Sequence, residues 1–168
     1  DSALRAVVVY LIVYAATNLG MFAVIIAVSR KTRSGQIESF GGLFSYAPAL
    51  GVMATVFLAS LAGIPPLGGW IAKFGAFQAL LTSGSGWGYA LAVIGAVNSV
   101  IAFGYYGVVM REIWIKPPPY GDTTPIRTPA SVVLALGITT VATLVLGVLP
   151  GIAMNFGDLA RISGSFGN

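Results

Sequence analysis

Apolar residues occupy four long stretches of this chain, over residues 4–28, 47–82, 87–112 and 129–150. Roughly 20 consecutive apolar residues are enough for a helix to cross a bilayer. The first, third and fourth stretches each have about that length, whereas the second is too long for one straight helix. The pattern predicts an all-α fold, a polytopic transmembrane helical bundle with about four spans.

A short segment rich in proline and glycine interrupts the second stretch. It covers residues 63–69 and reads GIPPLGG. Proline and glycine both disfavour the interior of a helix, proline because it lacks an amide hydrogen and glycine because of its backbone entropy. We therefore predict one discontinuous helix over residues 47–82. The residues expected to break it are Gly63, Pro65, Pro66, Gly68 and Gly69.

Two topologies fit this broken stretch, either a single interrupted span or a hairpin of two spans that turns at residues 63–69. The loops at residues 29–35 and 111–127 each carry three Lys or Arg residues. Positive residues in short loops mark the cytoplasmic side. A single span places both loops inside, whereas a hairpin places the second loop outside. The charges favour the single span, with the first helix running from outside to inside; the hairpin is the alternative.

Lys73 is the one charged residue within the second stretch. An ammonium group inside a membrane costs a few kcal/mol, so something must offset that cost. In the hairpin topology, Lys73 would lie near the turn and reach the headgroups. In the interrupted span it would lie deep, beside carbonyl groups that the break leaves free. Desolvation there would disfavour the charged form, which would suit a residue that takes up and releases protons. We predict that Lys73 is a proton-transfer residue.

Other polar side chains lie within the apolar stretches. Tyr10, Tyr14 and Asn18 are four residues apart, which places them on one helix face. Such groups can form hydrogen bonds between helices, or they can line a hydrated proton path. Further candidates are Gln78 in the second stretch and Asn98, Ser99, Tyr105 and Tyr106 in the third. The residues chosen as possible lining are Tyr14, Asn18, Gln78 and Tyr105.

Composition excludes several kinds of site. The sequence has no Cys and no His, so disulfides, haem, iron–sulfur clusters and thiolate or imidazole metal sites are absent. No glycine-rich phosphate-binding motif occurs, so we expect no cofactor in this chain and no direct NADH binding. The excess of positive charge lies in the short loops, which indicates membrane orientation rather than nucleic-acid binding.

The acidic residues leave Lys73 without an obvious partner in this chain. All five lie in the loops or near the ends: Asp1, Glu38, Glu112, Asp122 and Asp158. A counter-charge would therefore come from elsewhere, which indicates that the chain does not act alone. The sequence begins with Asp1 rather than Met, and we expect it to be the C-terminal piece of a longer protein or a small subunit trimmed at its start.

Three segments resemble one known family. SLAGIPPLGGWIAKF, at residues 60–74, resembles the S-L-A-G-I-P-x-x-x-G-F-x-x-K-F segment of subunit N of bacterial NADH–quinone oxidoreductase, respiratory complex I. YAATNLGMF, at residues 14–22, is similar to that family's Y-x-x-x-N-L-G-x-F run. SVIAFGYY, at residues 99–106, is similar to its S-x-I-x-x-x-Y-Y segment. The chain departs from the family at Trp70, where Phe is usual, and in the loop at residues 117–125.

This resemblance implies an antiporter-like, proton-translocating subunit of the membrane arm. The family has fourteen transmembrane helices, and residues 1–168 would match the last four, with Lys73 as the proton-handling lysine of the interrupted twelfth. The resemblance implies a non-redox subunit of a translocase, with flavin and iron–sulfur clusters in partner subunits. It places the chain in a bacterial inner (plasma) membrane, beside other membrane-arm subunits. A subunit of a multisubunit sodium/proton antiporter, or of a related membrane-bound hydrogenase, is the alternative.

Overall fold

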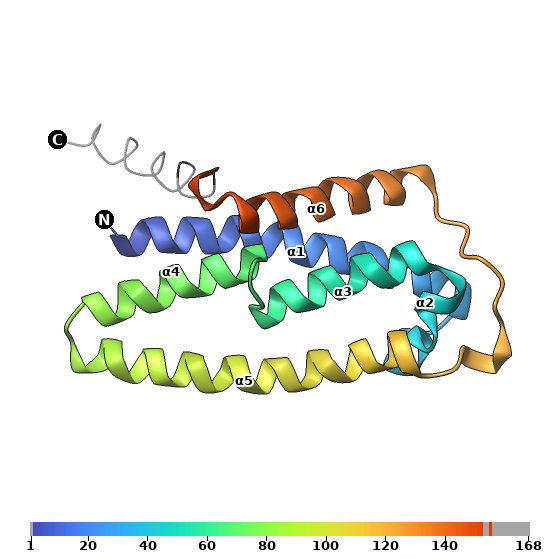
Figure 1. The fold of residues 1–168 in the computed structure, drawn as a ribbon, viewed down its shortest axis with the longest axis horizontal. Helices are drawn as coiled ribbons and strands as arrows, with labels where there is room; N and C mark the ends of the chain where they lie inside the picture. Colours follow the sequence, from blue (N-terminus) through green and yellow to red (C-terminus); the bar gives the residue numbers. More distant parts are fainter. Residues whose placement is uncertain (1, 153–154, 156–168) are drawn as a thin grey trace.

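The computed structural model describes residues 2–152 and residue 155, and all its regular elements there are helices. Three long helices run along the molecule, α1 (Ser2–Thr32), α5 (Gly86–Ile115) and α6 (Ala130–Val148), and α1 and α6 lie on the other side of the bundle from α5 (Figure 1). Each is long and apolar enough to cross a membrane. The prediction of a polytopic helical bundle is confirmed.

The second apolar stretch forms two helices of 15 residues each, α3 (Pro48–Ala62) and α4 (Gly68–Thr82). They follow one another along the length of the bundle, with an irregular segment between them (Figure 1). The stretch therefore runs along the bundle once as a discontinuous helix and does not fold back on itself as a hairpin would.

The break is shorter than the sequence indicates, because Gly68 and Gly69 belong to the first turn of α4. The preceding residue, Leu67, is extended, with φ −83° and ψ 160°, and acts as the N-cap. Glycine is unfavourable in a helix interior but is tolerated in a first turn whose amides lack helical acceptors. The irregular segment is thus residues 63–67.

Short elements close the end of the bundle at which α1 and α5 finish. They are the 3₁₀ turn η1 (Ile37–Phe40), the single turn α2 (Leu43–Tyr46) and the 3₁₀ turn η2 (Pro119–Gly121). The main apolar core lies nearby and joins η1 and α2 to α1, α3, α5 and α6. Phe57 of α3 is fully buried there and fits against Gly20 of α1, where an added Cβ would lie 2.3 Å from the ring.

Lys31 holds the two basic loops together at this end. Its Nζ lies 3.6 Å from Asp122 Oδ2 and 3.9 Å from the centre of the Tyr46 ring, and it also donates to the Thr124 carbonyl oxygen. Hydrogen bonds from the Thr124 side chain and amide hold the pKa of the Asp122 carboxyl below its ordinary value. The loops at residues 29–35 and 111–127 therefore lie at one end of the bundle, as a single interrupted span requires.

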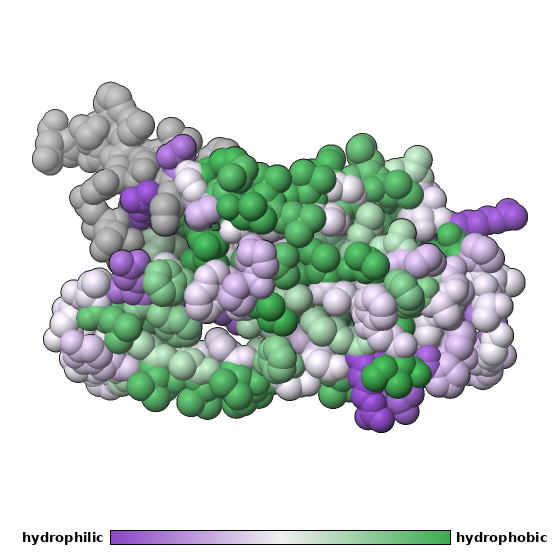
Figure 2. Space-filling view, viewed as in Figure 1, coloured by the Kyte–Doolittle hydropathy of each residue, from purple (hydrophilic) through white to green (hydrophobic). Residues whose placement is uncertain are grey.

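Apolar side chains dominate the outer surface (Figure 2). Within the described residues, α5 is the most exposed long helix: only 6% of its most apolar 18-residue segment is buried, against 44% for the corresponding segment of α1. Exposed side chains along α5 include Val93, Val97 and Val100. So much apolar surface along entire helices is unfavourable in water, and it suits a bundle surrounded by lipid or by other transmembrane helices.

Candidate functional site

The end of α3 is set by Gly63. Its φ of +88° is a left-handed conformation that glycine adopts readily. The Gly63 amide donates to Ser60 O at 2.9 Å, and the Ile64 amide donates to Ala59 O at 2.9 Å. This hydrogen bonding is that of a Schellman C-cap. Because the chain then turns away, the carbonyl groups of Leu61 and Ala62 have no helical donor.

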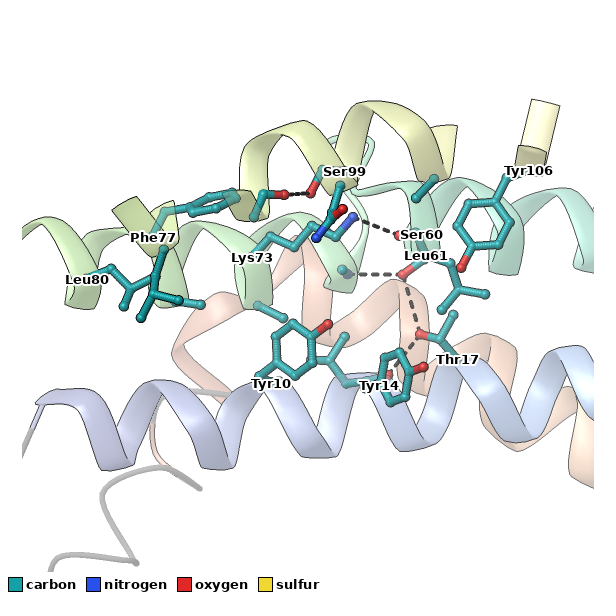
Figure 3. A pocket seen from close by; sticks show the side chains of 18 of the residues that line it. Tyr10, Tyr14, Thr17, Ser60, Leu61, Lys73, Phe77, Leu80, Ser99 and Tyr106 are labelled. Carbon is teal, nitrogen blue, oxygen red and sulfur yellow. Dashed lines mark hydrogen bonds between the residues drawn. The ribbon is translucent and has the colours of Figure 1, made fainter. Parts of the chain in front are cut away.

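Lys73 supplies the donor that these carbonyl groups lack. Its Nζ donates to Leu61 O at 2.9 Å (Figure 3) and to Ala62 O at 3.1 Å. The stem of the side chain passes over Gly63, where an added Cβ would lie 3.0 Å from Lys73 Cδ. The ammonium group thus sits at the C-terminus of α3, the negative end of the helix dipole. A snorkelling lysine would reach toward an end of the bundle. The Lys73 side chain instead turns back toward the break.

Ser60 joins the two halves of the interrupted helix. Its buried hydroxyl oxygen accepts a 3.0 Å hydrogen bond from the Gly69 amide, in the first turn of α4. The same hydroxyl lies 3.4 Å from Thr17 Oγ1 of α1, which donates to Val13 O in its own helix. An added Cβ on Gly69 would lie 1.8 Å from Ser60 O. The start of α4 therefore packs directly against the backbone of α3.

A cavity of about 420 Å³ lies beside Lys73, between α1, α4 and α5 (Figure 3). We call it the Lys73 cavity. One wall is apolar and includes Ala76, Phe77 and Leu80 of α4. Its polar lining residues are Tyr10, Tyr14, Thr17, Ser60, Lys73, Asn98, Ser99, Tyr105 and Tyr106.

The structure brings together only part of the predicted site. Lys73, Tyr14 and Tyr105 line the cavity, whereas Asn18 and Gln78 do not. Gln78 is five residues after Lys73, which is roughly 140° around the helix, so the two side chains face different directions. Asn18 uses its amide to donate to Tyr14 O in its own helix, at 2.8 Å.

Tyrosine pairs border the cavity from two helices. Tyr10 and Tyr14 of α1 stack with ring centres 5.7 Å apart, and Tyr105 and Tyr106 of α5 meet edge to face at 4.6 Å. The Ser60 hydroxyl is a further polar group, which sequence reasoning did not select. Its position one turn before the helix break was the available signal, because a hydroxyl there can reach amides of the next helix.

These groups can hold water and exchange protons with it. Hydroxyl and amide groups that line a cavity of this size can bind water molecules, and Lys73 is the one ionisable cation among the lining residues. Within residues 2–152 and 155, no cluster of three acidic side chains could hold a metal ion. Glu38, Glu112 and Asp122 do not line the cavity, and Asp158 lies outside the described residues.

An apolar bundle whose central helix is interrupted, with a lysine bonded to the interruption, has the architecture of ion-translocating membrane proteins. The comparison with known families agrees with this class. The chain belongs to the NADH:quinone oxidoreductase/Mrp antiporter transmembrane family, whose sequence profile matches residues 1–101.

Individual relatives point to one member of that family. The chain is 36% identical to NADH-quinone oxidoreductase subunit N of Anaeromyxobacter sp. over 152 residues, which are 88% of this chain and 29% of that protein. It is 37% identical to subunit N 2 of Sorangium cellulosum over 123 residues, 73% of this chain and 24% of that protein. It is 34% identical to subunit N of Geobacillus sp. over 147 residues, which are 88% of this chain and 29% of that protein. The resemblance to subunit N is confirmed, and the chain spans less than a third of these relatives.

Proposed function

We propose that this chain is the C-terminal part of a proton-translocating membrane-arm subunit of NADH–quinone oxidoreductase, in which Lys73 transfers protons. The observation that carries the proposal is the position of the Lys73 ammonium, bonded to the α3 terminus at one side of a polar cavity. The assignment to an oxidoreductase subunit is supported by the relatives, which are named NADH-quinone oxidoreductase subunit N. The family profile, which includes Mrp antiporters, supports antiporter-like proton transfer.

The proposed step is the exchange of one proton between Lys73 and water in the cavity. In the protonated state, the ammonium donates to Leu61 O and Ala62 O, whose partial negative charge favours the cation. A change of charge elsewhere in the complex would shift that balance. The proton would then leave for cavity water, and the hydroxyl groups of Tyr14 and Tyr105 would orient that water.

This role places redox chemistry in other subunits. The chain would be a non-redox subunit of a translocase, with flavin and iron–sulfur clusters in partner subunits, and it would bind neither NADH nor nucleic acid. It would contact other membrane-arm subunits in a bacterial inner (plasma) membrane. The loops at residues 29–35 and 111–127, which lie at one end of the bundle, would face the cytoplasm.

The test is Lys73→Met in the intact complex, with NADH–quinone turnover and proton pumping into sealed vesicles measured together. We expect pumping and coupled turnover to fall at least about a hundredfold, the lower end of the contribution of a positioned acid–base group, while the complex still assembles. Lys116→Met, at an exposed position just after α5, is the control and should leave both rates unchanged. Wild-type pumping by Lys73→Met would refute the role of Lys73.

The family profile also covers Mrp antiporters, so a subunit of a multisubunit sodium/proton antiporter is the second candidate, and a related membrane-bound hydrogenase is a variant of it. The same lysine and break would serve either. Purification of the native complex separates the candidates: flavin and iron–sulfur proteins would copurify with an oxidoreductase subunit, whereas only membrane subunits would copurify with an antiporter subunit.

A further inference from the structure

A second hollow lies between α1 and α6 and shares no lining residue with the Lys73 cavity. We call it the α1–α6 groove. Its volume is about 750 Å³, and its lining is wholly apolar: Ile12 of α1 and one face of α6 from Val133 to Leu146. Gly137 lies within this face, and an added Cβ there would meet nothing within 4 Å. The missing side chain at Gly137 therefore deepens the groove.

The groove is shorter than the hydrocarbon core of a bilayer. From Val133 to Leu146 the helix rises roughly 20 Å, whereas a helix needs about 30 Å to cross the whole hydrocarbon core. Immediately after the groove, Gly147 packs against the chain break, because an added Cβ would lie 2.3 Å from Pro66 O. The dimensions suit a single acyl chain better than a spanning helix.

Two arginines lie toward the end of the groove that is nearer the basic loops. Arg127 precedes the first groove residue of α6 by six positions. Arg30 follows Ile12 by 18 residues, which is five helical turns, so the two share a face of α1. Both arginines are exposed, and neither forms an ion pair within the described part of the chain. Lys31 differs, since its ammonium contacts Asp122.

We propose that the α1–α6 groove holds an acyl chain of an anionic phospholipid, whose phosphate is bound by Arg30 and Arg127. The apolar groove and the unpaired positive charges then serve the two parts of one ligand. Figure 2 shows the hydrophobic surface that runs over α6, with a hydrophilic side chain projecting beyond the end at which α6 begins. This site is independent of proton transfer by Lys73.

The experiment uses the full-length subunit within its native complex, reconstituted in lipid nanodiscs. The nanodiscs contain a trace of phosphatidylglycerol with a photoreactive acyl chain or, in parallel, the matching phosphatidylcholine. Illumination followed by peptide mass spectrometry locates the label. We expect labelled peptides from α1 and α6 around Ile12 and Gly137. The anionic lipid should label them at least about fivefold more, because each nearby arginine contributes about that factor.

Two matched pairs of variants test the two halves of the proposal. Gly137→Leu fills the groove and should lower labelling there at least about fivefold, whereas Gly104→Leu, at an equally open position on α5, should not. The double variant Arg30→Gln/Arg127→Gln should remove the preference for phosphatidylglycerol and keep the labelling by phosphatidylcholine. Arg111→Gln, an exposed arginine of α5, should preserve that preference.

Three results would overturn the proposal. Label found elsewhere on wild-type complex and absent from α1 and α6 would show that protein covers the groove. Equal labelling by the two lipids would remove the role of the arginines. Undiminished labelling of assembled Gly137→Leu would show that the acyl chain lies outside the groove. If a variant fails to assemble, the comparison of phosphatidylglycerol with phosphatidylcholine on the wild-type complex still tests the proposal.

Discussion

At the scale of single residues, backbone groups in the middle of the bundle acquire partners from side chains. Lys73 donates to two carbonyl groups at the end of α3, and Ser60 accepts from an amide at the start of α4. Unpaired backbone groups are expensive where water is scarce. The break therefore depends on Lys73 and Ser60 as much as on its prolines and glycines.

Gly69→Ala should destabilise the protein. Its Cβ would lie 1.8 Å from Ser60 O, a backbone atom that cannot move without separating α3 from α4. We expect a loss of about 1–3 kcal/mol or more in the free energy of unfolding, seen as a lower Tm of the purified complex. Gly75→Ala in the same helix meets nothing within 4 Å and should be neutral or slightly stabilising. Equal Tm values for the two variants would contradict this account.

Ser60→Ala removes an acceptor without adding volume. The Gly69 amide would lose its partner, and Thr17 would lose a hydroxyl neighbour 3.4 Å away. A lost cap of this kind costs about 1 kcal/mol, which should lower the Tm by a few degrees. Thr139→Ala on α6, whose hydroxyl donates only to carbonyl groups of its own helix, is the control and should change the Tm less.

At the scale of elements, hydropathy was sufficient to predict the helices but not all of the site. The broken helix over residues 47–82 followed from its length and its prolines and glycines, because these properties are local. The lining of the Lys73 cavity depends on helix rotation and packing. Gln78 is polar and close in sequence to Lys73, yet it faces another direction, whereas Ser60 reaches the site only because α4 begins against the end of α3. No single-residue property reports such contacts.

The connection between α5 and α6 should depend on pH through Asp122. Because its folded pKa is lowered by hydrogen bonds from Thr124 and by Lys31, its contribution to stability is present above the ordinary pKa of 3.8 and is lost as pH falls through the folded pKa. Asp122→Asn should speed hydrogen exchange in residues 117–125 at neutral pH. The ratio of variant to wild-type rates should begin to fall as the pH drops below 3.8 and should approach one once the pH is below the lowered pKa of folded Asp122.

The control for this measurement is Glu38→Gln, an exposed carboxyl group in the neighbouring turn η1. It should leave exchange in residues 117–125 unchanged at every pH. A ratio for Asp122→Asn that stays constant through the acidic range would show that the carboxylate charge does not hold the connection.

At the scale of the whole molecule, the interrupted helix determines which loops share a side. The contact of Lys31 with Asp122 joins the two basic loops, and the turn between α4 and α5 lies at the opposite end (Figure 1). The two basic loops therefore share one end of the bundle, whereas the turn between α4 and α5, at the other end, carries no charge; such a difference between loops is what orients membrane proteins.

Single-cysteine variants can verify this arrangement, because these 168 residues contain no native cysteine. Gly35→Cys and Thr123→Cys should react with an impermeant thiol reagent from the same side of sealed vesicles. Gly86→Cys, at the start of α5, should react only from the other side. Labelling of positions 35 and 86 from one side would instead restore the hairpin.

The equal lengths of α3 and α4, 15 residues each, have a consequence for the membrane voltage. The terminus of α3 that holds the Lys73 ammonium is close to the midpoint of the interrupted span, so a proton taken up by Lys73 under the proposed mechanism would have crossed roughly half of the electrical potential. Moving one charge across the full membrane is worth about 2.3 kcal/mol per 100 mV. The membrane potential would therefore favour proton uptake by Lys73 from the positive compartment by about 1.2 kcal/mol per 100 mV. It would oppose uptake from the negative compartment by the same amount.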